Sequence, residues 1–248
     1  MMIKKVVLIT LLLPVSVAAQ ELSTDRPDQT EAPFVVPFRT IQIECGFLHR
    51  NEKSGKSAEL PSILWRLSLS EIMEMRIITT HLKNRTGEWK ENGITPVEIG
   101  FKIKVCDEKG IRPQIGFIHH LVLHRIASEN FKANNYATNF RFAVQHNLSD
   151  KVNLSYNAGM EWEPYRSTGN FVYTLTSSFG MTDKLSVYVE IFGTIPEQES
   201  NIHSFDGGMA FLLFPNLQLD VSAGADFKNP SENYFISSGI SWRFSTKK

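Results

Sequence analysis

Short segments of this chain alternate apolar and polar residues, and the apolar side of each segment lacks Asp, Glu, Lys and Arg. The last such segment places Tyr234, Ile236, Ser238, Ile240, Trp242 and Phe244 on one face. Side chains on a strand point to opposite faces with period two. One face of each strand therefore suits hydrocarbon and the other suits water, and twelve such segments follow one another between Ile41 and Phe244.

The exclusion of charge from these faces is informative because 21% of the residues are charged. A Lys or Arg that faces lipid at mid-membrane costs about 2–4 kcal/mol, and a closed sheet with an uncharged outer face is typical of a transmembrane β-barrel. The pattern predicts an all-β fold, a transmembrane antiparallel β-barrel of about 12 strands. A soluble β-sandwich is the structural alternative, and it would require the apolar faces to contact each other instead of lipid.

The joins between the segments alternate in length, and the tight ones contain Asp, Gly, Asn and Ser, as turns require. The long joins are His49–Leu60, Leu82–Thr95, His124–Asn134, Glu163–Asn170, Thr194–Asn201 and Lys228–Ser231. The tight joins are Ser70–Glu71, Asp107–Gly110, Asn147–Asp150, Thr182–Lys184 and Phe214–Asn216. Short periplasmic turns and longer extracellular loops are the outer-membrane arrangement, with both termini on the periplasmic side.

The first residues have the features of an export signal. Lys4 and Lys5 precede the apolar run Val6–Leu13, and Val17–Ala19 forms a small-residue cleavage site. The run is too short to span a bilayer as a helix. We therefore expect a signal peptide over residues 1–19, a periplasmic or lumenal segment over 20–37 and a barrel over 38–248, located in the outer membrane of a Gram-negative bacterium.

The faces opposite the apolar ones contain most of the strand charges, and we expect them to line the lumen as a transport path. The candidate lining residues are Glu44, Arg66, Glu74, Arg76, Glu98, Lys102, Lys104, Arg112, Arg141, Glu161, Glu190, Asp206, Asp220, Asp226 and Arg243. Such a wall is either a water-filled path with weak ion selectivity or a network of ion pairs that fills a small barrel. The whole chain balances 26 basic against 26 acidic residues, so nothing favours a nucleic-acid partner.

The segment before the first strand, Glu21–Pro37, is distinctive because it holds three prolines and several charges. The prolines exclude a regular helix or a central strand. Asp25, Arg26, Asp28 and Glu31 could pair with lumenal charges, which would fold the segment inward as a plug or constriction. The alternative is a periplasmic leader that only connects to the first strand.

Catalytic and metal-binding sites have little support in the sequence. A lipid hydrolase would need a Ser nucleophile beside a His base, but His119 and Ser177 are predicted to lie three strands apart. His119 and His120 point to opposite faces, and a metal site through His120 and His124 lacks further ligands. We expect no catalytic residue, no metal and no cofactor. Cys45 and Cys106 are expected to be unpaired because they fall on segments far apart in the sheet.

One stretch resembles a known family. The runs Ser23–Glu31, Val35–Pro37 and Ile41–Phe47 are similar to the opening of outer-membrane β-barrel transporters described as phenol meta-pathway degradation-like, of the type common in Bacteroidetes. The sequence departs from the family pattern at Cys45, where a small residue or Thr is expected. The resemblance implies an outer-membrane location and transport of small, hydrophobic or aromatic compounds, and it supplies no catalytic residues.

These observations together predict a non-enzymatic, porin-like channel for passive passage of small solutes through a polar lumen. The expected partners are outer-membrane lipid, the barrel-assembly machinery during insertion and a small-molecule solute of unknown identity. The alternative function is a non-conducting structural or binding barrel whose extracellular loops contact a partner.

Overall fold

The computed structural model describes residues 22–165 and 168–246 of the chain, so the expected signal peptide over residues 1–19 lies outside the described residues. The elements are β1 (Thr40–Glu52), β2 (Gly55–Ser68), β3 (Met73–Thr86), β4 (Trp89–Ile94), β5 (Val97–Cys106), β6 (Gln114–Leu123), the 3-10 turn η1 (Glu129–Phe131), β7 (Ala137–Ser149), β8 (Val152–Trp162), β9 (Gly169–Gly180), β10 (Leu185–Pro196), β11 (Ile202–Phe214), β12 (Leu217–Asp226) and β13 (Tyr234–Ser245). Within the described residues, no helix is long and apolar enough to cross a membrane.

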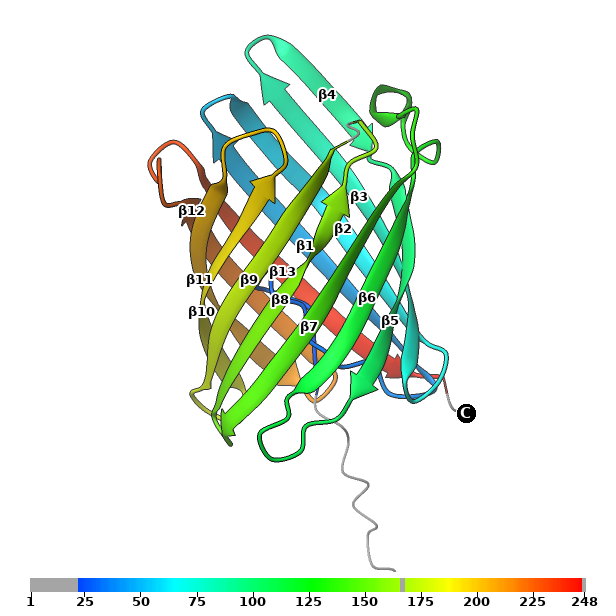
Figure 1. The fold of residues 1–248 in the computed structure, drawn as a ribbon, viewed down its shortest axis with the longest axis vertical. Coiled ribbons are helices and arrows are strands. Elements are labelled where there is room, and N and C mark those ends of the chain that lie inside the picture. The colour runs from blue at the N-terminus through cyan, green and yellow to red at the C-terminus, as the bar shows by residue number, and fades with distance from the viewer. Residues whose placement is uncertain (1–21, 166–167, 247–248) are drawn as a thin grey trace, which may run out of the picture.

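The strands form one closed antiparallel barrel (Figure 1). Apart from β4, which pairs only with β3, each strand pairs with its neighbours around the barrel, and β1 closes the sheet by pairing with β13 from Thr40↔Ser245 to Asn51↔Tyr234. The lower half of β3 pairs with β5, whereas its upper half pairs with β4. The barrel proper therefore has twelve strands, and β4 is an additional strand above it. The predicted fold class is confirmed.

The upper ends of the first strands differ from the prediction. The join predicted over His49–Leu60 is mostly strand, because β1 and β2 extend to a turn at Lys53 and Ser54. The join predicted over Leu82–Thr95 is a hairpin in which β4 pairs with β3 from His81↔Ile94 to Thr86↔Trp89. Strands that rise above the lipid need no apolar face, so period-two hydrophobicity does not reveal them.

The predicted alternation of faces is confirmed on β13. Ile236 is 58% exposed and Trp242 is 52% exposed, whereas Phe235 and Ser237, on either side of Ile236, are buried. Exposed large apolar residues also lie on β1, β2, β5, β6, β7 and β9 to β12, and together they form the apolar belt that the lipid requires. Cys45 and Cys106 are both free, as expected.

The two ends of the barrel differ in loop length. One end has turns at residues 69–72, 107–113, 150–151, 181–184 and 215–216. The other end has the long loops 124–136 and 227–233 together with the hairpin of β3 and β4 (Figure 1). We therefore assign the end with long loops to the extracellular side and the end with short turns to the periplasmic side.

Candidate functional site

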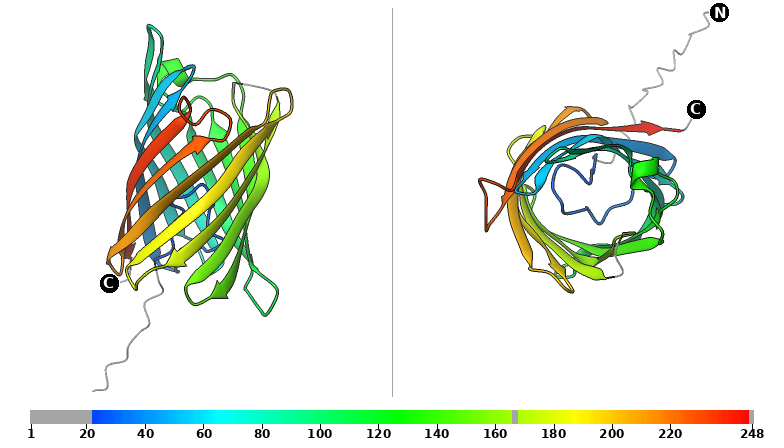
Figure 2. Two further views of the ribbon diagram at one scale, coloured as in Figure 1. Left: turned by 90° about the vertical axis from the view of Figure 1, so that its left-hand side faces the viewer. Right: turned by 90° about the horizontal axis from the view of Figure 1, so that it is seen from above.

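The lumen contains the segment Leu22–Arg39, which precedes β1 and lies inside the ring of strands (Figure 2). A segment without a partner strand leaves its backbone N–H groups to other acceptors. Wall side chains fill this role. The backbone N–H of Asp25 donates to Glu44 at 2.9 Å, that of Val36 donates to Glu74 at 2.7 Å, and that of Gln29 donates to Glu190 at 2.8 Å. The segment thus folds inward, as the first of the two interpretations of its charges proposed.

On one side, the segment contacts a cluster of charged residues that we call the ion-pair wall. It consists of Glu44 on β1, Arg66 on β2, Glu74 and Arg76 on β3, and Lys102 on β5, all of them buried. Arg66 donates to Glu74 at 2.8 Å and to Glu44 at 2.9 Å, so wall residues already pair with one another.

The segment completes this wall through Asp25. Its Oδ2 lies 2.6 Å from Arg76 Nη1 and 3.3 Å from Arg66 Nη1, and its Oδ1 lies 2.8 Å from Lys102 Nζ. Three cations of the wall converge on one carboxylate. Without Asp25, the buried Lys102 would keep only Glu31 within ion-pair distance, at 4.0 Å, and a poorly paired buried charge is costly. Asp25 therefore links the segment to three strands at once.

A second carboxylate of the segment extends the network. Glu31 lies 2.5 Å from Arg76, whose Nε donates to His120 Nε2 at 3.1 Å. His120 Nδ1 contacts Asn139, and Asn139 donates to Glu98 at 3.2 Å. A chain of hydrogen bonds thus runs from the segment through β3 and β6 to β7 and back to β5.

Arg26 occupies a slot in the wall formed by two glycines. Gly46 and Gly239 face each other in the pairing of β1 with β13. A Cβ at either position would overlap the Arg26 guanidinium, so only glycine leaves room for the side chain to lie against the wall. Arg26 Nη2 donates to Asp220 at 3.0 Å and to Ser237 at 2.9 Å.

On the opposite side, the segment contacts a surface that we call the acidic wall, formed by Glu190, Asp206, Tyr188, Thr174 and Thr176 of β9, β10 and β11. Glu190 and Asp206 are direct cross-strand partners. Glu190 Oε1 accepts from Thr30 at 2.5 Å and from Thr176 at 2.8 Å, and Tyr188 donates to Asp206 at 2.9 Å. Among the described residues, neither carboxylate forms a salt bridge with a cation.

The two walls shift the acids of the segment in opposite directions. Burial alone would raise the pKa of Asp25, but Arg66, Lys102 and Arg76 hold it well below its usual range. Burial likewise opposes ionisation of Glu31, yet Arg76 lowers its pKa. For Asp28, burial and the nearby Glu190 carboxylate both raise the pKa well above its usual value. The ion-pair wall therefore favours the anionic forms of Asp25 and Glu31, whereas the acidic wall favours the protonated form of Asp28.

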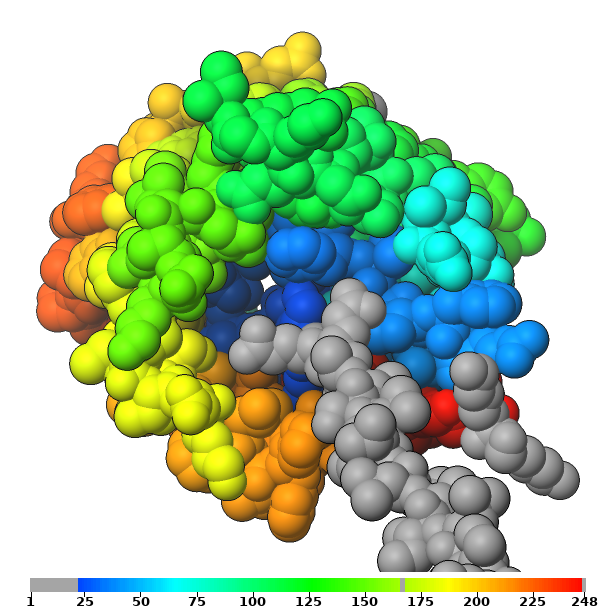
Figure 3. All heavy atoms as spheres, turned by 90° about the horizontal axis from the view of Figure 1, so that it is seen from below, coloured from blue at the N-terminus to red at the C-terminus, as the bar shows by residue number. Residues whose placement is uncertain are grey.

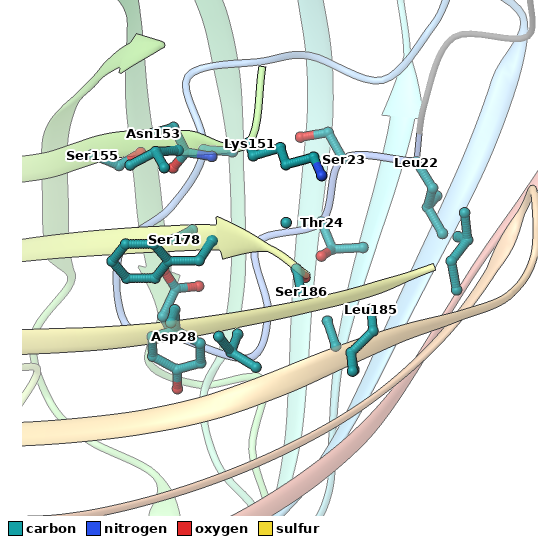
Figure 4. A pocket seen from close by; sticks show the side chains of 18 of the residues that line it. Leu22, Ser23, Thr24, Asp28, Lys151, Asn153, Ser155, Ser178, Leu185 and Ser186 are labelled. Carbon is teal, nitrogen blue, oxygen red and sulfur yellow. The ribbon is translucent and has the colours of Figure 1, made fainter. Parts of the chain in front are cut away.

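Two cavities lie on either side of the segment. The periplasmic vestibule has a volume of about 550 Å³, and its lining includes Leu22, Asp28, Thr30, Lys151 and Ser186 (Figure 4). The extracellular vestibule has a volume of about 630 Å³, and Gln29 forms part of its lining. Consecutive residues of the segment thus face different vestibules. Seen from the periplasmic end, atoms of the segment are visible inside the ring of strands (Figure 3).

The structure brings most predicted lining residues to the inner wall. Those in contact with the segment are Glu44, Arg66, Glu74, Arg76, Lys102, Arg141, Glu190 and Asp220. Glu98, Glu161, Asp206, Asp226 and Arg243 also lie on inward positions. Lys104 lies near the periplasmic end of β5 and pairs with Asp107 at 3.1 Å.

Arg112 is the exception. It lies in the turn between β5 and β6, where it pairs with Lys109 and its side chain donates to the Asp107 carbonyl at 3.2 Å. The turn predicted over Asp107–Gly110 in fact extends to Pro113, which removes Arg112 from the wall.

Sequence reasoning based on charge missed the neutral polar contacts. Asn157 accepts from the Glu31 backbone at 2.7 Å, and Thr174 contacts Thr30 at 2.5 Å. The predicted alternation already places both residues on the inner face, but the candidate lining set was restricted to charged residues. The apolar inward residues Phe192 and Phe235 were omitted from that set for the same reason.

Within the described residues, no group of three or more His, Cys, Asp or Glu side chains is arranged to hold a metal ion. Solved structures with similar folds are outer-membrane barrels. The COG4313 outer membrane channel from Pseudomonas putida F1 has a TM-score of 0.65 and 11% identity, covering 86% of this chain and 98% of that one. The NanC porin has a TM-score of 0.57 and 8% identity, with coverages of 81% and 98%. The KdgM porin has a TM-score of 0.56 and 11% identity, with coverages of 81% and 99%.

The likeness to these structures supports the fold. No curated protein sequence matches the chain. The family model described as "Putative MetA-pathway of phenol degradation" matches residues 24–244, which includes the lumenal segment and nearly the whole barrel. The chain belongs to this family.

Proposed function

We propose that the protein is a channel for passive passage of small solutes across the outer membrane. The observation that carries the proposal is the pair of vestibules separated by the lumenal segment. Asp28 and Thr30 line the periplasmic vestibule, and Gln29 between them lines the extracellular one. Solutes would pass between the segment and the acidic wall, where hydrogen bonds to Glu190 and Asn157 hold the segment.

Within this proposal, the ion-pair wall anchors the segment and the acidic wall forms the variable side of the constriction. Breaking the contacts to Asp25 would leave the buried Lys102 with only the distant Glu31 as a partner, which is strongly unfavourable. The hydrogen bonds to Glu190 exchange more easily with water. A hydrogen bond between neutral groups contributes about 0.5–1.5 kcal/mol to stability, and one to a charged acceptor contributes about twice as much.

The family description, together with inward aromatic residues, favours aromatic or hydrophobic compounds among the solutes. Outer-membrane lipid would surround the apolar belt, and the barrel-assembly machinery would insert the chain. Passive passage requires only an open path through the lumen, and no residue of the site is proposed to catalyse a reaction.

Planar-bilayer conductance tests the function. The purified mature chain is expected to give small, stable current steps, and a variant lacking residues 20–37 is expected to give larger ones because the lumen is emptied. An absence of current in both proteins would overturn the channel function. It would favour the alternative of a binding barrel, in which the exposed hairpin of β3 and β4 with Trp89 at its tip would contact a partner.

A further inference from the structure

The extracellular vestibule combines an apolar surface with a cation. Val172 on β9, Phe192 on β10 and Phe235 on β13 are part of its lining, and so is Arg50 on β1. Phe192 and Phe235 meet edge to face, with ring centroids 6.3 Å apart. Arg50 lies over the Phe235 ring, with its Cζ 5.4 Å from the centroid. The guanidinium and the Phe192 ring therefore contact the same aromatic side chain from different sides.

The aromatic surface depends on a glycine in the neighbouring strand. Gly224 is the direct cross-strand partner of Phe235, and a Cβ there would approach the Phe235 ring to 2.6 Å. The Phe235 ring therefore packs directly against the backbone of β12, and it contacts both Phe192 and Arg50. Phe192 is only half-buried, so part of its ring remains open to a ligand in the vestibule.

Arg50 differs in its partners from Arg141, the other arginine in the described lining of the vestibule. Arg141 pairs with Glu161 and also donates to the Gln29 carbonyl at 3.4 Å. The side chain of Arg50 forms no hydrogen bond within the described part of the chain, and its ion pair with Glu52 spans 3.9 Å between two partly exposed side chains. Glu59 on β2 is the other carboxylate near it. Its five N–H donors remain available to a planar acceptor.

Two of the three acidic residues in the described lining, Glu161 and Asp226, are fully engaged, and the third, Glu52, lies 3.9 Å from Arg50. Glu161 is paired with Arg141, while Asp226 accepts from Ser204 at 2.7 Å and from Asn233 at 2.8 Å. An anion that enters the vestibule therefore meets one incompletely bonded guanidinium beside an open aromatic ring. A carboxylate binds a guanidinium through two parallel hydrogen bonds, and an aromatic ring packs on Phe in an offset or edge-to-face arrangement.

We propose that the extracellular vestibule binds small aromatic carboxylates, with the ring against the exposed part of Phe192 and the carboxylate on Arg50. This inference rests on the proposed channel function and names the solute class that its entrance selects. The cavity of about 630 Å³ is large enough for a single-ring acid with its water.

Calorimetric titration of the purified, detergent-solubilised protein tests the inference without requiring conductance. Benzoate is the probe, benzyl alcohol retains the ring without the charge, and acetate retains the charge without the ring. Benzoate is expected to bind, and the other two are expected to bind about tenfold more weakly or not at all. Equal binding of benzoate and benzyl alcohol, or no binding of benzoate, would overturn the proposal.

Three variants sharpen the test. Arg50→Gln is expected to weaken benzoate binding about tenfold and to leave benzyl alcohol unchanged. Glu52→Gln is expected to strengthen benzoate binding, because it removes the carboxylate that competes for Arg50. Lys151→Gln in the periplasmic vestibule is the matched control and should change neither. Unchanged binding in Arg50→Gln would contradict the assigned pose. Benzoate binding by a protein that gives no current would refute the channel while sparing the binding site.

Discussion

The ion-pair wall and the acidic wall hold the same short segment by different physical means. The first uses three cations that converge on Asp25 and a fourth contact from Arg76 to Glu31. The second uses hydrogen bonds from Gln29 and Thr30 to the single carboxylate of Glu190. Buried ion pairs are costly to break by halves, whereas a hydrogen bond to a carboxylate exchanges with water. The comparison teaches that an internal segment can be anchored on one side and adjustable on the other.

Removal of Asp25 is expected to have the largest effect. Asp25→Ala removes the carboxylate closest to Lys102 and leaves that ammonium only Glu31, 4.0 Å away, so we expect the seated segment to be destabilised by about 3–5 kcal/mol. We expect a several-fold rise in single-channel conductance and faster proteolysis within the segment. The double variant Asp25→Ala with Lys102→Met removes one cation as well and should recover part of the loss. Unchanged conductance in the single variant would show that the ion-pair wall is not the anchor.

Closing the glycine slot is expected to have the next largest effect. Gly46→Val places a side chain where the Arg26 guanidinium lies, and overpacking of this kind costs about 1–3 kcal/mol. The contacts of Arg26 with Asp220 and Ser237 should be lost, and conductance should rise. Gly180→Ala is the control, because the nearest atom to its added Cβ would be 3.7 Å away, an ordinary contact. Equal behaviour of the two variants would contradict the role of the slot.

The two walls are expected to respond to pH in opposite directions, which the channel conductance should reveal. Asp28 has a raised pKa, so its contact with the acidic wall is complete below its usual 3.8 and weakens as pH rises toward the raised value. Asp25 has a lowered pKa, so its contribution is present above 3.8 and is lost as pH falls below it. Conductance should therefore be lowest in mildly acidic solution and rise on both sides.

The alkaline branch of this profile is assigned to Asp28. Asp28→Asn keeps the group neutral at every pH and should remove the rise toward alkaline pH while leaving the acid branch in place. Asp107→Asn, in an exposed periplasmic turn, is the control and should keep both branches. Bilayer recordings across the pH range measure the profile, and an alkaline branch that persists in Asp28→Asn would be evidence against the acidic wall as the adjustable side.

The smallest effect is expected outside both walls. Arg112→Gln changes an exposed residue of a periplasmic turn and should leave conductance and ion selectivity unchanged. Arg141→Gln alters an inward residue that pairs with Glu161 and contacts the segment at Gln29, and it should shift ion selectivity toward cations. Reversal potentials in a salt gradient distinguish the two substitutions. A shift of equal size in both would contradict the placement of Arg112 outside the path.

The sequence allowed the strand register to be predicted because lipid excludes charge so strictly. On β13, the alternation of Ile236, Trp242 and Phe244 with Ser237 and Arg243 leaves only one arrangement in a membrane. The hairpin that contains Trp89 escaped prediction because no lipid constrains it. Strands outside the lipid need no apolar face, so the hydrophobic pattern does not predict them.

The sequence allowed two interpretations of the lumenal segment, and an inward position was one of them. The residues that the segment contacts could not be predicted from the sequence. The contact of Asp25 with Lys102 joins residues 77 positions apart, and charge alone does not select this pair among many. Glycines on inward strand positions, such as Gly46 and Gly239, contained a usable signal because glycine within a strand often marks a close approach of another chain segment.

A reversible tether between the segment and the acidic wall tests the account most directly. Thr30 and Thr174 hydroxyl oxygens lie 2.5 Å apart, so Thr30→Cys with Thr174→Cys, in a background of Cys45→Ser and Cys106→Ser, should form a disulfide. Conductance measured before and after reduction is the deciding quantity. The account predicts a low, pH-independent conductance when oxidised and the ordinary pH-dependent conductance when reduced. The same conductance in the oxidised, reduced and segment-deleted proteins would contradict it.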